Sequence, residues 1–174
     1  KDNKIHDNYF HKNKAIILNS FSESLFGKFN LQNIIAAYAV SKILNLDTKI
    51  FLKIISKFKG LPHRSEKIFE NKKFSIINNS KATNIDSTVN SLEGHKNIYL
   101  ILGGKSKDSN FKPLLNHKKN ILKCFIIGES SQLIYRQIHK SINSKISNTL
   151  HNAIKDIFFA ANQCRENTKK TILF

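Results

Sequence analysis

Residues 98–104 are Ile98-Tyr99-Leu100-Ile101-Leu102-Gly103-Gly104, five apolar residues that end at a pair of glycines. A continuous apolar run of this length is typical of a strand that is buried on both faces of a sheet. Phe74–Ile77 and Cys124–Ile127 also have the composition of short strands, and the second ends at Gly128. Segments with helical spacing separate the three strands. This alternation predicts an α/β domain, Rossmann-like, with a mostly parallel sheet covered on both faces.

The helices of this domain are predicted from apolar residues that recur every three or four positions. The clearest stripe covers residues 150–161, and a second helix is expected over Ser130–His139. A proline in its second position predicts a helix over Lys112–Lys118, because the first helical turn does not use the N–H group that proline lacks. A short helix over Asp86–Leu92 and a last strand that begins at Ile172 complete the predicted domain.

The pattern before residue 60 is different. Tyr9–Phe10 and Ala15–Leu18 are predicted to form two short strands joined by a polar turn. A helix with Asn30 as its N-cap is expected next, since its apolar residues follow helical spacing. A second helix is expected to begin with either Asp47 or Thr48 as its cap.

The segment Gly60-Leu61-Pro62 ends the second of these helices and marks the predicted domain boundary. Residues 1–59 are expected to be part of one domain and residues 60–174 most of another. The first residue is not Met, and the last four residues resemble a strand with nothing after it. Both ends of the chain are therefore expected to be cut from a longer protein.

Composition limits the possible functions. The formal net charge is +17, but the lysines are scattered along the chain and form no aromatic–basic module, so specific nucleic-acid binding is not expected. A basic, non-catalytic module that binds nucleic acid remains an alternative. The chain has no apolar run of about 20 residues and no signal peptide. Cys124 and Cys164 have no metal-type spacing and are expected to be reduced thiols of a cytoplasmic protein.

Two polar clusters follow directly after predicted strands. Residues 78–84 follow the strand Phe74–Ile77, and residues 103–107 follow the strand that ends at Leu102. The carboxyl ends of parallel strands meet at one edge of a sheet, where ligands bind in open α/β folds. Lysines, hydroxyls and amides on one edge would suit a carboxylate or a phosphate. The alternative is that both clusters are ordinary polar turns. The second is not a Walker A loop, which needs a longer loop before its lysine.

Two further groups could meet a nucleotide. His63 and Arg64 follow Pro62 at the domain boundary, and the planar guanidinium of arginine suits phosphate. Asn30 and Asn33 lie at the start of a predicted helix, where amides and free N–H groups can meet a polar ligand. A solvated linker and simple helix capping are the plain alternatives.

The four groups, in this order and spacing, resemble the Mur ligase family, and most closely its D-glutamate-adding members. The resemblance covers the chain from about residue 27 to its end. The strings that carry it are Gly27-Lys28-Phe29-Asn30-Leu31-Gln32-Asn33 with Ala36-Ala37, Gly60-Leu61-Pro62-His63-Arg64-Ser65-Glu66, Asn78-Asn79-Ser80-Lys81-Ala82-Thr83-Asn84, and Leu102-Gly103-Gly104-Lys105-Ser106-Lys107 with Phe111.

The resemblance implies a monomeric, cytoplasmic, three-domain enzyme of peptidoglycan synthesis that uses ATP and Mg²⁺. Its reaction would phosphorylate the carboxylate of UDP-N-acetylmuramoyl-L-alanine, after which the amine of D-glutamate would attack the acyl phosphate. Residues 1–59 would be the C-terminal part of the central ATP-binding domain, and residues 60–174 an incomplete amino-acid-binding domain. The resemblance assigns ATP binding to Asn30, Asn33, His63, Arg64 and Lys81, and D-glutamate binding to Lys81, Thr83 and Lys107.

The chain departs from the family pattern at two positions. Asn79 stands where the family usually has Asp, and Phe29 stands where it often has His. The family's Walker A loop, metal ligands and catalytic residues would lie upstream of Lys1, so this stretch is expected to hold no catalytic residue or metal ligand and to be inactive alone. Other Mur ligases and folylpolyglutamate synthases share the domain plan and remain alternatives, although the string that begins at Ser80 argues against them.

Overall fold

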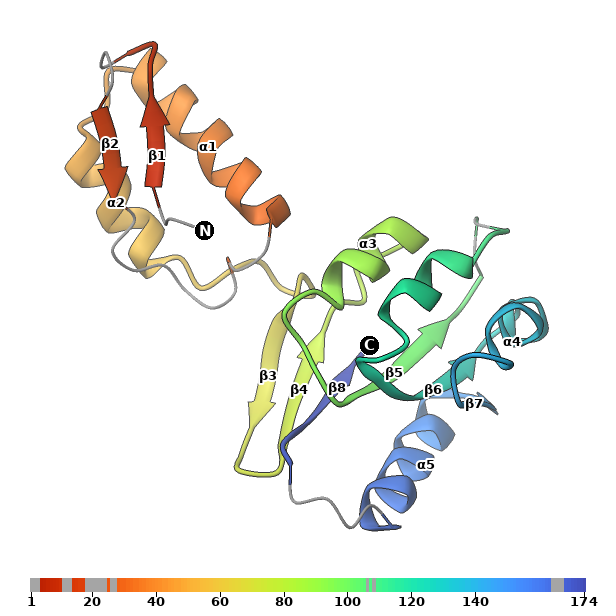
Figure 1. Cartoon of the computed structure of the whole chain (residues 1–174). Helices are drawn as coiled ribbons and strands as arrows, with labels where there is room; N and C mark the ends of the chain where they lie inside the picture. Colours follow the sequence, from red (N-terminus) through yellow and green to blue (C-terminus); the bar gives the residue numbers. More distant parts are fainter. Residues whose placement is uncertain are drawn as a thin grey trace. The chain divides into compact units, whose positions relative to one another are not determined.

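The computed structural model describes residues 4–10, 14–17, 25, 28–105, 107, 109–163 and 168–174. These residues form two compact units, Lys1–Leu61 and Pro62–Phe174, which are described separately. The division falls two residues after the predicted boundary. Figure 1 shows the elements of both units. In chain order they are β1 (Lys4–Asp7), β2 (Lys14–Ile17), α1 (Lys28–Ile43), α2 (Thr48–Lys57), β3 (Glu66–Glu70), β4 (Phe74–Asn78), α3 (Ile85–Ser91), β5 (Ile98–Gly103), the 3₁₀ helix η2 (Lys112–His117), β6 (Ile121–Ile127), α4 (Ser131–Ile138), β7 (Ser144–Asn148), α5 (Leu150–Gln163) and β8 (Lys170–Leu173).

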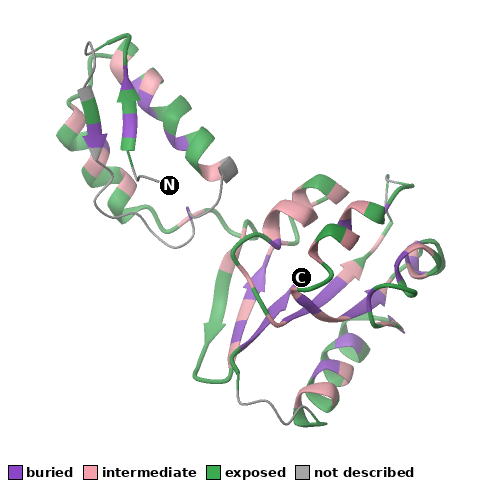
Figure 2. Cartoon of the chain, in the orientation of Figure 1, coloured by how far each residue is buried: buried purple, intermediate pink, exposed green. Residues whose placement is uncertain are grey.

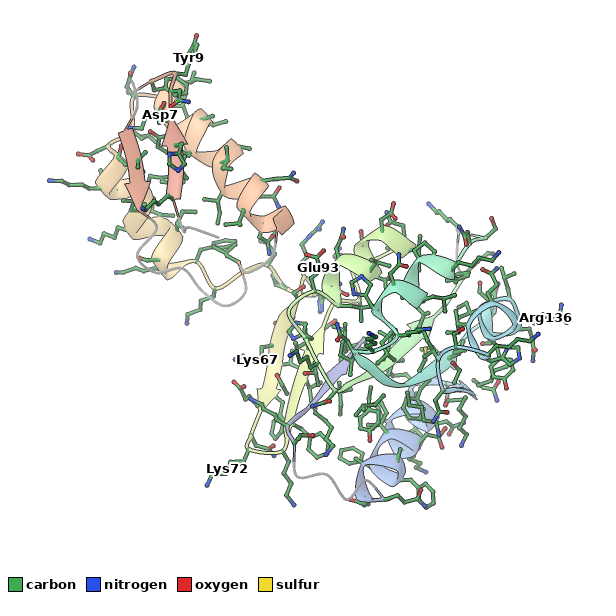
Figure 3. All side chains as sticks on the ribbon, viewed as in Figure 1. Asp7, Tyr9, Lys67, Lys72, Glu93 and Arg136 are labelled. Carbon is green, nitrogen blue, oxygen red and sulfur yellow. The ribbon has the colours of Figure 1, made fainter. Side chains whose placement is uncertain are left out.

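The first unit is an antiparallel pair, β1 and β2, packed with α1 and α2. Its core includes the ring of Tyr38, which meets Phe51 edge-on at 5.5 Å and donates a hydrogen bond of 2.6 Å to the buried carboxylate of Asp7. The other oxygen of that carboxylate accepts the N–H groups of Tyr9 and Phe10. Asp7 and Tyr9 are labelled in Figure 3.

Two predictions for this unit are wrong. Tyr9–Phe10 is not a strand, because β1 ends at Asp7. The side chain of Asp7 accepts hydrogen bonds from the N–H groups of Tyr9 and Phe10, and the chain turns there. Asn30 is not an N-cap, because α1 already includes Lys28, so Asn30 is the third residue of the helix. The cap predicted for the second helix is confirmed at Asp47, whose side chain accepts the N–H of Lys49 at 2.6 Å.

The second unit is built on a six-stranded sheet with the order β3-β4-β8-β5-β6-β7. All neighbouring strands are parallel except β3, which forms an antiparallel hairpin with β4. The predicted Rossmann-like α/β fold is confirmed. The strands β4 and β5 do not pair with each other, because β8 lies between them and bonds to both.

Side chains of successive strand residues point to opposite faces, so each strand contributes to two cores. On one face, Leu100 and Ile126 share a core with residues of α3, η2 and α4. Figure 1 shows these elements beside the sheet, and Figure 2 shows that much of the central strands is buried. On the other, Tyr99 and Phe125 pack against α5, which carries the chain back from β7 to β8. Burial raises the pKa of the free Cys124 thiol to about 12, so it is an inert core group. Cys164 lies outside the described residues.

The helical segment predicted over Lys112–Lys118 is a 3₁₀ helix and not an α-helix. Its proline occupies the first turn as expected. Within the described part of the chain, no helix combines the length and the apolar character that crossing a bilayer requires.

Candidate functional site

A pocket of about 180 Å³ lies at the carboxyl edge of the sheet, where the loops that follow β4 and β5 meet. The two polar clusters were predicted to share this edge, and the described structure brings residues of both to one cavity. Its volume is below the roughly 300–1,000 Å³ of pockets for drug-sized ligands, so it suits a small molecule rather than a whole nucleotide. The lining residues are Ser80, Ala82, Thr83, Asn84, Ile85, Thr88, Leu102, Gly103, Lys105, Phe111 and Ile134.

The pocket combines apolar and polar walls. Phe111 and Ile134 are almost fully buried and give it an apolar side. Thr83 and Thr88 contribute polar residues to the lining, and the hydroxyl of Thr88 donates to the carbonyl of Asn84 at 3.1 Å. The ammonium group of Lys105 lies 4.0 Å from the carboxylate of Glu129, and their side chains are 85% and 75% exposed. Such an exposed ion pair contributes little, so Lys105 can turn toward an anionic ligand at low cost.

The loop after β4 is held by its own backbone and by the end of β8. The N–H group of Asn79 donates to the carbonyl of Phe174, and the N–H group of Ala82 donates to the carbonyl of Asn79 at 2.8 Å. The side chain of Asn84 accepts the N–H of Ser87 at 2.8 Å and so caps α3. Residues 79–84 therefore form a fixed turn from the strand into the helix.

Where the loop after β5 begins, its backbone lies in close contact with the backbone at the end of β6. A Cβ atom at Gly103 would lie 1.9 Å from the carbonyl oxygen of Ile127, and one at Gly128 would lie 2.7 Å from the Cα of Gly104. The N–H of Gly104 also donates to the carbonyl of Ile127 at 3.0 Å. Glycine is required at Gly103 and Gly128 because the end of β5 and the end of β6 approach this closely.

Gln137 on α4 holds the far end of the same loop. Its Oε1 accepts the N–H of Phe111 at 2.8 Å, and its Nε2 donates to the carbonyl of Ser109 at 2.7 Å. Lys107 lies in the same loop, just before the two anchored residues, and is exposed. Sequence reasoning did not find Gln137, because a glutamine on a helix carries no signal of its own.

Only some of the predicted site residues line the pocket. Thr83 is one of the lining residues. The lysine among the described lining residues is Lys105, and the predicted ligands Lys81 and Lys107 are not among them. Lys81 is exposed, and its N–H donates to the carbonyl of His63 at 3.1 Å. Lys105 belongs to the second polar cluster, but no contact with a particular ligand was predicted for it.

His63 and Arg64 lie in an exposed turn at the start of the second unit. No described residue forms a hydrogen bond or ion pair with the guanidinium of Arg64, so it can meet a phosphate. In the first unit, Asn30 is partly buried and Asn33 is exposed, and both lie within α1. Their assignments remain predictions. In the described ranges no group of three or more His, Cys, Asp or Glu side chains could hold a metal ion.

Solved structures share this architecture. The UDP-N-acetylmuramate–alanine ligase MurC of Thermotoga maritima matches 85% of this chain with a TM-score of 0.68 and 19% identity, over 34% of its own length. MurF of Acinetobacter baumannii matches 84% with a TM-score of 0.67 and 14% identity, over 35% of its length. The fold is therefore the one found in ligases of the Mur type. No protein-family model matches the chain.

Sequence relatives agree with the fold. A UDP-N-acetylmuramoylalanine–D-glutamate ligase of Wolbachia sp. subsp. Brugia malayi is 33% identical over 139 residues, and one of Buchnera aphidicola subsp. Schizaphis graminum is 40% identical over 124 residues. These alignments cover 80% and 69% of this chain. The chain belongs to the Mur ligase family. It spans 28% of the length of each of these two relatives.

Proposed function

We propose that the protein to which this chain belongs is an ADP-forming ligase that joins D-glutamate to UDP-N-acetylmuramoyl-L-alanine in peptidoglycan precursor synthesis, in the cytoplasm. The observation that carries the proposal is the small pocket at the sheet edge, which combines Thr83 from one predicted cluster with Lys105 from the other. The names of the relatives support the choice of D-glutamate.

The pocket has the chemistry that a small dicarboxylic amino acid requires. A carboxylate that leaves water needs a cation and donors to replace its hydration. Lys105 and Thr83 line the pocket, and Lys107 lies two residues further along the same loop as Lys105. We assign the D-glutamate carboxylates to these groups and to Lys81, and we assign the contacts with ATP to His63, Arg64, Lys81 and the amides Asn30 and Asn33.

In the proposed reaction, ATP transfers its terminal phosphoryl group to the carboxylate of the UDP-sugar peptide. The amine of D-glutamate then attacks the acyl carbon, an amide bond forms, and phosphate leaves. The part of this chain is to hold D-glutamate with its amine free and to bring Arg64 to the nucleotide. Positive charge near the transferring group stabilises the transition state.

The described residues fit ATP better than they fit Mg²⁺. The exposed guanidinium of Arg64 and the exposed His63 suit a nucleotide phosphate, but no described cluster of acidic or histidine side chains could hold the metal. We therefore propose that the rest of the protein supplies the Mg²⁺ ligands, and that residues 1–59 belong to the ATP-binding domain and residues 60–174 to the amino-acid-binding domain.

The test is ADP release by the complete protein, supplied with ATP, Mg²⁺ and UDP-N-acetylmuramoyl-L-alanine. D-glutamate, L-glutamate, L-lysine and meso-diaminopimelate are offered in turn. Release with D-glutamate alone is the expected result. Release with another amino acid would keep the family and overturn the substrate, and no release from folded protein would overturn the activity and reopen the nucleic-acid alternative.

Variants of the complete protein separate the two ligands. Lys105→Ala and Lys107→Ala should each raise the KM for D-glutamate about tenfold or more, because each removes a charged hydrogen-bond donor. Arg64→Ala should raise the KM for ATP more than the KM for D-glutamate. Lys118→Ala removes an exposed lysine that directly follows the 3₁₀ helix and is the matched control for loss of one charge. The opposite pattern of KM changes would show that the two sites are interchanged.

A further inference from the structure

The turn that carries His63 and Arg64 is bonded to the segment at the end of β4. The N–H of Ser65 donates to Oδ1 of Asn79 at 3.0 Å, and the N–H of Lys81 donates to the carbonyl of His63 at 3.1 Å. The side-chain amide of Asn78 lies 2.7 Å from Nδ1 of the His63 ring. Two neighbouring asparagines therefore join the predicted nucleotide turn to the loop of the amino-acid pocket.

The orientation of the Asn78 amide follows from a second hydrogen bond. Its Oδ1 accepts the N–H of Ser80 at 3.1 Å, so its Nδ2 is the atom that faces His63. An amide nitrogen only donates, and Nδ1 must then accept with its lone pair. The ring hydrogen of a neutral His63 is therefore on Nε2. A hydrogen on Nδ1 would place two donors 2.7 Å apart.

The carboxylate of Glu66 also lies near the His63 ring. One of its carboxylate oxygens lies 3.8 Å from Nδ1, which is beyond hydrogen-bond distance. The same oxygen accepts the backbone N–H of His63 at 2.8 Å. Glu66 thus holds the backbone of the turn and leaves the contact with Nδ1 to Asn78.

The backbone of the turn needs such support. His63 has a φ of 64° and Ser65 a φ of 49°, both in the left-handed region. A residue with a side chain is held there only where its surroundings fix it. The hydrogen bond from Ser65 to Asn79 and the bond that His63 accepts from Lys81 supply this restraint.

We infer that Asn78 and Asn79 are positioning residues for the nucleotide turn. Asn79 fixes the backbone that carries Arg64, and Asn78 keeps the hydrogen of His63 on Nε2, so that His63 offers a donor to an acceptor oxygen such as that of a phosphate or a sugar. Only this last step rests on the proposed function. This role also explains why Asn79 can stand where the family usually has Asp, because the hydrogen bond from Ser65 needs an acceptor oxygen and not a charge.

The tautomer of His63 is tested in this chain by ¹⁵N-resolved NMR of its seven histidine rings at mildly alkaline pH. His63→Gln assigns the signal. His63 is expected to show the pattern of a ring with hydrogen on Nε2. In Asn78→Asp, a carboxylate oxygen replaces the donor while the bond from Ser80 remains possible, so the hydrogen should move to Nδ1. Asn84→Asp adds the same charge to the same loop without contact to His63 and should leave the pattern unchanged.

A hydrogen on Nδ1 in the unaltered chain would overturn the inference without any variant. An Asn78→Asp chain that is folded and keeps its hydrogen on Nε2 would also overturn it. Amide hydrogen exchange at Ser65 tests Asn79. Asn79→Leu should speed that exchange about tenfold or more because the acceptor is lost, and Asn79→Asp should keep it slow. Equal exchange in the two variants would remove Asn79 from the positioning role.

Discussion

The contact at Gly103 allows a quantitative prediction for Gly103→Ala. The added methyl group would lie 1.9 Å from the carbonyl oxygen of Ile127, whereas ordinary contact begins near 3.4 Å. Gly103 pairs with Ile127 in the ladder between β5 and β6. Relief of the overlap would move the strands apart by about 1.5 Å and break the hydrogen bond that Gly104 donates to Ile127.

The expected destabilisation has three parts. A side chain at the φ of 146° found at Gly103 costs about 1–3 kcal/mol. Overpacking against a fixed backbone adds about 1–3 kcal/mol, and loss of one hydrogen bond adds about 1 kcal/mol. The free energy of unfolding should therefore fall by about 3–7 kcal/mol, a large part of the 5–15 kcal/mol that is usual for a domain.

Gly94→Ala is the matched control, because Gly94 also has a positive φ, 81°, but has no atom within 4 Å of the added methyl group. It should cost only about 1–2 kcal/mol. Chemical denaturation of the two variants and of the unaltered chain gives the comparison. Equal losses in both variants would refute the close approach of β5 and β6, whereas an unfolded Gly103→Ala chain beside a folded Gly94→Ala chain would support it.

Three other substitutions test separate contacts. Gln137→Leu in the complete protein should raise the KM for D-glutamate more than that for ATP, because the loop that carries Lys107 loses both anchors; equal changes in the two KM values would contradict this. Hydrogen bonds from Lys169 and Lys67 lower the pKa of Glu70 to about 2, so its contribution to stability is present above its ordinary pKa near 4.5 and is lost as pH falls toward 2. Glu70→Gln should therefore lower the denaturation midpoint at pH 7, and this effect should disappear as pH falls through 2; an undiminished effect in acid would count against the ion pairs. Tyr38→Phe should destabilise the first unit by about 1–3 kcal/mol, since Asp7 loses a buried donor; burial raises the pKa of Tyr38 to about 12, so ultraviolet titration should lose one late-ionising tyrosine in the variant.

The sequence predicts the buried centre of the fold well and its edges poorly. The strand over residues 98–102 and the helix over 150–161 were located because they are buried and strongly periodic. The strands β3 and β7 were not predicted, because they lie at the two edges of the sheet and contain many polar residues among few apolar ones. The strand β6 begins three residues earlier than predicted, since Lys123 interrupts its apolar run while its ammonium group lies 5.5 Å from the centre of the Phe125 ring.

The candidate site was predictable in its loops and not in its exact lining. Parallel strands bring their carboxyl ends to one edge, so Thr83 and the residues after Leu102 were expected together. Which lysine faces the cavity depends on the path of the loop, and the structure favours Lys105 over Lys107. Thr88 and Ile134 belong to helices that pass over the pocket, a relation that no local pattern shows.

The place of β8 in the sheet has a consequence for synthesis on the ribosome. In the sheet that the structure describes, β8 lies between β4 and β5 and bonds to both, so the hairpin of β3 and β4 cannot join the other strands of this sheet before residues 170–173 have been made. At about 5–20 residues per second, the nascent chain carries two incomplete sheet fragments with open edges for several seconds. Exposed strand edges invite pairing with other chains. Chaperone demand should therefore be greatest just before β8 leaves the exit tunnel.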